Sequence, residues 1–200
     1  MADKVRLIDE FVAKASAPFV FKVASKDCEF AQIHRLNHKT FVEEIPQHDA
    51  TSDMLLVDRF HEENTYFICL KGVRLIGMVA ARDQRPFSLD QKLENLDSYL
   101  PAESSICEIR LLSIEKEHRV GRIIQGLLTI LARHCTDRGY DIAIISGTVL
   151  QERFYQRLGF VSFGPRVGQP GALYQPMYRE LGTLEDEFSA LFRRAPPLRV

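Results

Sequence analysis

Residues 105–148 read SICEIRLLSIEKEHRVGRIIQGLLTILARHCTDRGYDIAIISGT, and this stretch decides the fold. Its first part, 105–114, is rich in isoleucine and leucine, as a strand would be. From 122 to 138 the apolar residues recur at helical spacing, and Gly139 is a typical helix end. Residues 141–148 form a nearly continuous apolar run, typical of a strand buried on both faces. The order strand, helix, strand predicts an α/β unit at the centre of the chain.

The residues before this unit add a strand, a helix and a hairpin. Residues 18–25 predict a strand, and Asp27 is placed to cap the helix that follows it. Two β-rich runs, 64–70 and 73–83, flank a Lys-Gly pair and predict an antiparallel hairpin. An insertion comes next, and its leucines at helical spacing predict a further helix: Leu89, Leu93, Leu96 and Leu100.

The residues after the unit complete a single domain that we expect to span 1–200. Residues 149–158 predict a short helix, and Pro176 predicts that the last strand is bent or lies at a sheet edge. The chain ends, 1–17 and 181–200, are expected to form an N-terminal helix and a C-terminal helix with a tail. Because helices and strands alternate irregularly, the fold class is mixed α/β.

Composition excludes several classes of protein. The 200 residues carry 26 basic and 27 acidic side chains, whereas nucleic-acid binders usually have a basic excess, so no nucleic-acid partner is expected. No apolar run approaches 18 residues, and the N-terminus has acids where a signal peptide would be apolar. The four cysteines lie far apart without a CxxC pair, which argues against a disulfide framework. We therefore expect a cytoplasmic protein without a membrane span.

A metal site is not expected either. His34 and His38 have the four-residue spacing of helical metal ligands, but no third ligand lies within reach in the sequence. These two histidines are therefore interpreted as part of a solvated helix face.

Two short motifs resemble those of the GNAT superfamily of N-acyltransferases. Residues 112–119, LSIEKEHR, are similar to the strand end and turn that its members write as L-A-V-D-P-E-Y-R. Residues 154–160, FYQRLGF, are similar to the family's F-Y-x-x-L-G-F box. The resemblance implies a GNAT-like fold, with a central twisted mixed sheet of about six to seven strands flanked by helices.

The resemblance also implies roles for individual residues. The strand before the turn would bulge and leave backbone N–H groups near Leu112 and Ile114 free for the pantetheine and the thioester oxygen. Tyr155 would protonate the departing thiolate, and Glu108 would take the proton of the incoming amine. Arg110 could hold the carboxylate of an amino acid substrate. The alternatives are a structural ion pair between Glu108 and Arg110 and a packing role for Tyr155.

The turn into the long helix is the expected binding site for the donor's phosphate. Free N–H groups and the positive end of a helix dipole favour a phosphate there. The residues concerned are Arg119, Val120, Gly121, Arg122, Ile123 and Ile124.

This turn departs from the family pattern Q/R-x-x-G-x-G/A, because Arg122 and Ile124 occupy its two glycine positions. A phosphopantetheine arm has a single phosphate and needs less of the loop than coenzyme A does. Residues 116–138 also carry five basic and two acidic residues, a balance that would steer an acidic acyl carrier protein. We expect that carrier as donor and partner, with a coenzyme A thioester as the alternative and no tightly bound cofactor.

A second resemblance indicates which branch of the superfamily the sequence is similar to. Residues 36–44, LNHKTFVEE, resemble the L-R-Y-x-V-F-V-E segment of acyl-homoserine lactone synthases, although Asn37 replaces their arginine. The sequence is most similar to the related long-chain N-acyl amino acid synthases, which join a fatty acyl group to an amino acid such as tyrosine. Three alternatives stay open: an acetyl-CoA-dependent N-acetyltransferase, an acyl-homoserine lactone synthase-like enzyme, and a non-catalytic domain that binds acyl thioesters.

Overall fold

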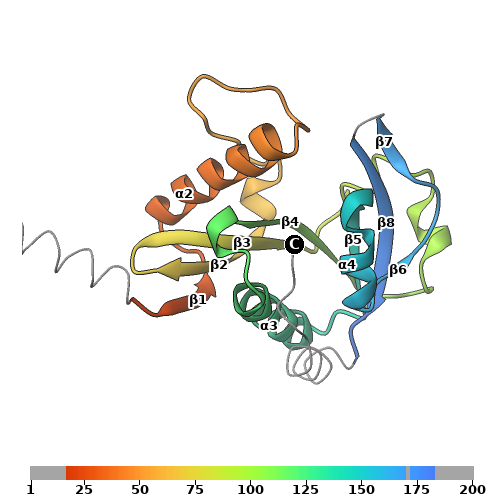
Figure 1. The fold of residues 1–200 in the computed structure, drawn as a ribbon. Helices are drawn as coiled ribbons and strands as arrows, with labels where there is room; N and C mark the ends of the chain where they lie inside the picture. Colours follow the sequence, from red (N-terminus) through yellow and green to blue (C-terminus); the bar gives the residue numbers. More distant parts are fainter. Residues whose placement is uncertain (1–16, 170–171, 183–200) are drawn as a thin grey trace, which may run out of the picture.

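The computed structural model describes residues 17–169 and 172–182, and these residues form one mixed sheet flanked by helices (Figure 1). The strand order is β1-β2-β3-β4-β5-β8-β6, and β7 also pairs with β8. The strands are β1 (Phe19–Val23), β2 (Thr65–Lys71), β3 (Arg74–Arg82), β4 (Ile106–Ile114), β5 (Ile142–Thr148), β6 (Val161–Ser162), β7 (Val167–Gln169) and β8 (Ala172–Glu180). The helices are α2 (Asp27–His38), α3 (Gly121–Arg138) and α4 (Glu152–Arg157), with short 3-10 turns at His61–Glu63, Leu96–Tyr99, Lys116–His118 and Val149–Gln151.

The central unit forms as its sequence predicts. β4 and β5 pair in parallel, and α3 is the crossover between them. Gly139 ends α3 with a φ of +68°, a left-handed conformation that suits glycine. All other strand pairs are antiparallel, so the predicted mixed α/β class is confirmed. The sheet has eight strands rather than six or seven, because the short β6 and β7 both pair with β8.

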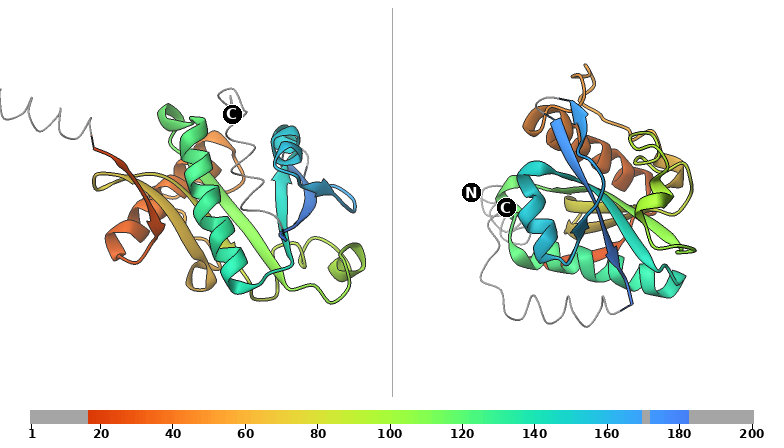
Figure 2. Two further views of the ribbon diagram at one scale, coloured as in Figure 1. Left: turned by 90° about the horizontal axis from the view of Figure 1, so that it is seen from below. Right: turned by 90° about the vertical axis from the view of Figure 1, so that its right-hand side faces the viewer.

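Helices cover both faces of the sheet (Figures 1 and 2). α3 packs on β1, β2 and β3 through a buried stripe that includes Ile123, Leu127 and Leu131. α2 lies on the opposite face, where Ile33 and Leu36 join a second apolar cluster. The two faces of the sheet therefore have separate apolar clusters. An opening between two strands is lined by one set of residues on one face of the sheet and by another set on the other face.

Two predicted details are wrong. β8 is not an edge strand, because it pairs with β5 on one side and with β6 and β7 on the other. The strand tolerates Pro176, whose carbonyl accepts the Phe163 N–H at 3.0 Å. Asp27 does not cap α2; instead the Glu29 carboxylate accepts the N–H groups of Ser25 and Lys26 at 2.9 and 3.3 Å.

The insertion between β3 and β4 forms turns and one 3-10 turn rather than the helix predicted for it. Its four leucines are nevertheless all buried in a third apolar cluster, with Ile142 and Ile144 of β5. The predicted N-terminal helix, 1–17, and C-terminal helix, 181–200, lie almost entirely outside the described residues. None of the helices within residues 17–169 and 172–182 has the length and hydrophobicity that crossing a bilayer requires.

Candidate active site

β4 carries the bulge that the family resemblance implies. Ala80 of β3 pairs with Arg110, and Met78 pairs with Ser113, so Leu111 and Leu112 together oppose one residue of β3. Leu111 has a φ of +55°, which is unusual for a residue with a side chain. The extra residue turns the backbone of β4 at the point where the predicted donor-binding groups lie.

β4 separates from β5 after Glu108, before the bulge. Their pairing covers only Ile106–Glu108 with Ile142–Ile144, and the rest of each strand has no partner on this side within the described residues. Figure 1 shows the two strands diverging, with β5 and β8 turned away from β1–β4. The backbone groups of β4 between Ile109 and Ile114 that do not bond to β3 therefore face an opening, where a ligand amide could replace the missing strand.

An apolar cavity of about 30 Å³ lies at this divergence. Its walls come from β4, β5, α3, α4 and the segment after β8. Every side chain around it is an aliphatic or aromatic one: Ile109, Leu128, Leu131, Ile145, Tyr155, Leu158, Phe160 and Leu181. The lining is apolar throughout, as contact with a methylene group requires, and the volume is about that of a single water molecule.

Tyr155 of α4 borders this cavity. Its ring lies against the backbone of Gly147, where an added Cβ would be 2.8 Å from the ring carbon Cδ2. Its hydroxyl donates weakly to Oε1 of Gln151 at 3.4 Å. Burial raises the pKa of Tyr155 to about 12, so the phenol stays protonated at physiological pH and is available as a proton donor.

Glu108 lies on the other face of the sheet and is only 1% exposed. Its two carboxylate oxygens accept the Ser88 backbone N–H at 2.9 and 3.1 Å, and one also accepts the Ser88 hydroxyl. The Arg110 Nε lies 3.8 Å away, so the ion pair that was the alternative for Glu108 is present. Glu108 thus anchors the insertion to β4 and faces Arg110.

Arg110 is held by residues that the sequence did not single out. Its NH2 group donates to Asp58 at 3.0 Å, and its guanidinium lies 4.6 Å from the centre of the Phe60 ring. The other terminal nitrogen, NH1, is buried and has no hydrogen-bond partner among the described residues. Asp58 is fixed in turn by the Asn64 side chain at 2.9 Å. A planar cation with one unused donor is suited to binding a carboxylate.

The turn into α3 contains the six residues predicted to contact the donor. Val120 precedes the helix in an extended conformation, and neither a capping side chain nor an acidic residue occupies the first turn. The N–H of Ile123 bonds to the Val120 carbonyl at 3.0 Å, whereas no bond is recorded for Gly121 or Arg122. The side chains of Ile123 and Ile124 are buried in the core, so only their backbone could serve a ligand.

The arginines of this turn already have partners. Arg119 donates from Nε to the Ile114 carbonyl at 3.0 Å and also pairs with Glu44. Arg122 is exposed and lies 4.5 Å from the centre of the Phe19 ring. Arg119 would have to exchange Glu44 for a phosphate, whereas Arg122 has no recorded acidic partner among the described residues.

A π-helical segment, Lys39–Glu44, continues α2 and packs against this turn. Besides the pair of Glu44 with Arg119, Lys39 pairs with Glu115, which also lies 3.7 Å from Arg74. These contacts join residues 36–44 and 112–119, two of the three segments that carry the family resemblances. The partners are more than 70 residues apart, which is why no local pattern predicts them.

The histidine pair does not form a metal site with other ligands in the described residues. The interpretation as a solvated face is wrong, because His38 is buried and contacts Glu43 at 3.1 Å. His34 Nε2 lies 3.4 Å from His61 Nδ1, which is 3.2 Å from the Tyr66 hydroxyl. Burial, together with His61, lowers the pKa of His34.

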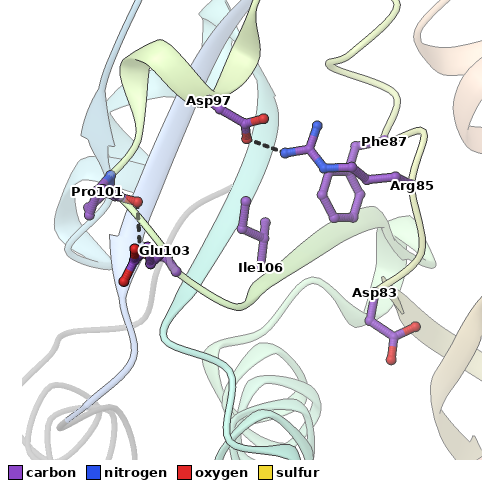
Figure 3. A pocket seen from close by; sticks show the side chains of 9 residues that line it. Asp83, Arg85, Phe87, Asp97, Pro101, Glu103 and Ile106 are labelled. Carbon is purple, nitrogen blue, oxygen red and sulfur yellow. Dashed lines mark hydrogen bonds and ion pairs between the residues drawn. The ribbon is translucent and has the colours of Figure 1, made fainter.

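A larger cavity of about 350 Å³ is lined mainly by residues of the insertion and by none of the predicted site residues. Figure 3 shows Arg85 beside it, directed at Asp97, and Asp90 pairs with the same guanidinium at 2.6 Å. Phe87 and Ile106 supply apolar side chains to its wall. This cavity shares no lining residue with the apolar cavity between β4 and β5, and unlike that cavity it is lined by charged side chains.

Comparison with solved structures identifies the fold. The CoA-dependent acyl-homoserine lactone synthase BjaI, solved with SAM and isopentyl-CoA, has a TM-score of 0.74 at 17% identity, covering 92% of this chain and 96% of its own. FeeM, an N-acyl amino acid synthase from uncultured soil microbes, has a TM-score of 0.68 at 16% identity, with 88% and 96% covered. A GNAT-family acetyltransferase from Staphylococcus aureus Mu50 has a TM-score of 0.58 at 11% identity, with 82% and 99% covered. At these identities the likeness shows the fold alone.

The sequence itself matches a family. None of the curated proteins matches it. The family profile of N-acyl amino acid synthase FeeM, however, matches residues 32–179, which include α2, the bulged strand, the turn into α3 and α4. The match covers most of the chain, and the GNAT-like arrangement of strands agrees with it. The chain therefore belongs to the FeeM N-acyl amino acid synthase family and is an N-acyltransferase.

Proposed function

We propose that this N-acyltransferase transfers a long-chain fatty acyl group from an acyl carrier protein thioester to the amine of a free amino acid, such as tyrosine. The observation that carries the proposal is the divergence of β4 and β5 at Glu108 and Ile144. On one face the opening meets an apolar cavity with Tyr155, and on the other it meets Arg110. A thioester and an amino acid could therefore approach each other from opposite faces.

The reaction is a direct transfer. The amine attacks the thioester carbonyl carbon, a C–N bond forms, and the C–S bond breaks to release a thiol. Backbone N–H groups of Leu112 and Ile114 are proposed to stabilise the oxygen that becomes negative in the tetrahedral intermediate. None of the residues lining the cavity is a cysteine, so the proposal includes no acyl-enzyme.

Two protons move in this scheme. Glu108 takes the proton that the amine loses, and Tyr155 gives a proton to the departing thiolate. Proton exchange with solvent then returns Glu108 to the carboxylate and Tyr155 to the protonated phenol. The hydrogen bonds from Ser88 hold Glu108 in place, and its ion pair with Arg110 links the base to the residue proposed to bind the carboxylate.

The carrier-protein donor is supported by the turn before α3. The family's glycine positions are occupied by Arg122 and Ile124, and the buried Ile124 side chain leaves the loop little freedom to open for a pyrophosphate. Lys116, Arg122 and Arg133 are exposed, and such cations would favour an acidic carrier protein. The basic character of this surface is local, because the chain as a whole has a formal net charge of −1.

A coenzyme A donor is the second candidate, because BjaI shares the fold and is CoA-dependent. Steady-state turnover with palmitoyl carrier protein, palmitoyl-CoA and acetyl-CoA, each with the same amino acid, distinguishes the two. We expect the carrier-protein thioester to give the highest kcat/KM. Equal or better use of acetyl-CoA would contradict the long-chain carrier proposal.

A further inference from the structure

Lys92 crosses from the insertion to the far side of the opening. Its Nζ lies 3.3 Å from the Ser146 hydroxyl oxygen on β5 and 4.8 Å from the centre of the Tyr174 ring on β8. The insertion backbone is fixed nearby, since Leu89 and Leu93 are buried in the cluster beneath it. The ammonium is therefore positioned by three separate elements of the fold.

This cation has no recorded carboxylate partner among the described residues. The other basic residue of the insertion, Arg85, is also exposed and pairs with both Asp90 and Asp97. Lys92 instead faces Arg59, Arg110 and Glu108, and Arg110 is itself paired with Asp58. Desolvation lowers the pKa of Lys92, Glu108 opposes this shift, and Arg110 and Arg59 add to it. A carboxylate bound beside the ammonium would stabilise its charged form.

The position of Lys92 relates it to Arg110. Glu108 pairs with Ile144 at the last rung before β4 and β5 separate. Two residues further along each strand, Arg110 and Ser146 point to the same face of the sheet, on opposite sides of the opening. Arg110 has an unpartnered NH1, and Ser146 contacts Lys92. The two cations thus flank the entrance on the face opposite the Tyr155 cavity.

We propose that Lys92 and Arg110 together bind the carboxylate of the acceptor, which makes Lys92 the residue that selects amino acids over amines without a carboxylate. The assignment rests on the proposed function. One carboxylate oxygen would accept from the Lys92 ammonium, and the other from the Arg110 guanidinium. The α-amine of the same substrate would then point into the opening, towards the thioester.

The test compares acceptors that differ only in the carboxylate. Wild type and the Lys92→Met variant are assayed with one acyl carrier donor and three pairs: L-tyrosine and tyramine, L-phenylalanine and phenethylamine, L-leucine and 3-methylbutylamine. For the best-used pair, we expect the variant to raise KM for the amino acid about 10- to 100-fold, as for the loss of a charge-assisted hydrogen bond. The kcat for the amino acid and the kinetic constants for the amine should change little.

Two further variants separate recognition from folding. Lys92→Arg keeps the charge and should recover much of the preference for amino acids. Lys26→Met removes an exposed lysine at the start of α2 and should leave the preference unchanged. The melting temperature of Lys92→Met should match that of wild type, because its side chain has a single recorded hydrogen bond.

The outcomes are distinct. An active Lys92→Met enzyme that keeps the wild-type ratio of kcat/KM for amino acid and amine would overturn the assignment of Lys92 alone. An equal loss with both acceptors would also overturn it, because the effect would not depend on the carboxylate. A wild type inert toward every acceptor would overturn the proposed function, and the role of Lys92 with it.

Discussion

Ser88 donates both its backbone N–H and its hydroxyl to the buried carboxylate of Glu108. The two residues lie 20 positions apart, and the contact joins the insertion to β4 at the last rung that it shares with β5. The group proposed as the base is therefore fixed by the segment that also carries Lys92. Positioning of the base and recognition of the acceptor depend on the same insertion.

Replacing Glu108 by Gln tests its role as the base. The amide can still accept the hydrogen bonds of Ser88, so the fold should persist, while kcat with an amino acid should fall about 100-fold or more, as for loss of a general base. Steady-state kinetics and the melting temperature measure the two effects. An active Glu108→Gln enzyme would indicate that Glu108 only anchors the insertion.

Tyr155→Phe removes the proposed proton donor and keeps the ring that packs on Gly147. We expect kcat to fall about 100-fold with KM nearly unchanged, because only the transition state is affected. The exposed Tyr99 provides the matched control, and Tyr99→Phe should have wild-type kinetics. Equal rates for Tyr155→Phe and wild type would show that the thiolate leaves without help from this phenol.

Gly147→Ala tests whether the position of Tyr155 matters. The new methyl group would lie 2.8 Å from the ring, so the ring must shift away from the opening at a cost of about 1–3 kcal/mol. We expect lower kcat and a lower melting temperature. Gly182→Ala is the control, since no atom of residues 17–169 or 172–182 outside its chain neighbours lies within 4 Å of its added Cβ. Full activity of Gly147→Ala would separate the ring position from catalysis.

Some elements of the fold follow from the sequence and others do not. The spacing of apolar residues and Gly139 predicted α3 correctly. The family resemblance implied a bulge in the strand before α3, and the structure has it at Leu111 and Leu112. The leucines of the insertion have the same spacing but form no long helix, because burial against Ile142 and Ile144 satisfies them without one. The spacing of apolar residues shows which side chains are buried more reliably than it shows the secondary structure of the backbone that carries them.

Long-range contacts could not be predicted from the sequence. Asp58 lies in a connection with no recognisable pattern, yet it holds Arg110 at a separation of 52 residues. The sequence does not single out Lys92, and only the placement of β5 and β8 shows what its ammonium contacts. Such contacts depend on which distant segments the topology makes neighbours. The residue types and their spacing within one segment do not predict this.

His34 should make stability depend on pH. Its folded-state pKa lies below 6.5 because of burial and His61, so the unfolded chain binds the proton more readily. The stabilisation is fully present above pH 6.5 and is lost as the pH falls below that value. Urea unfolding between pH 7.5 and 5 should show a smaller decline for His34→Gln than for wild type. The exposed His48 gives the control, and equal slopes for wild type and both variants would contradict the prediction.

The central claim is that the protein joins a fatty acyl group to the amine of an amino acid. Mass spectrometry of lipid extracts from cells expressing wild type or Tyr155→Phe tests it most directly, because the product's mass and fragments reveal both parts. We predict a long-chain N-acyl amino acid in the wild-type extract and a strongly reduced amount with the variant. Wild-type extracts without any such amide, or with acetylated amines only, would contradict the claim.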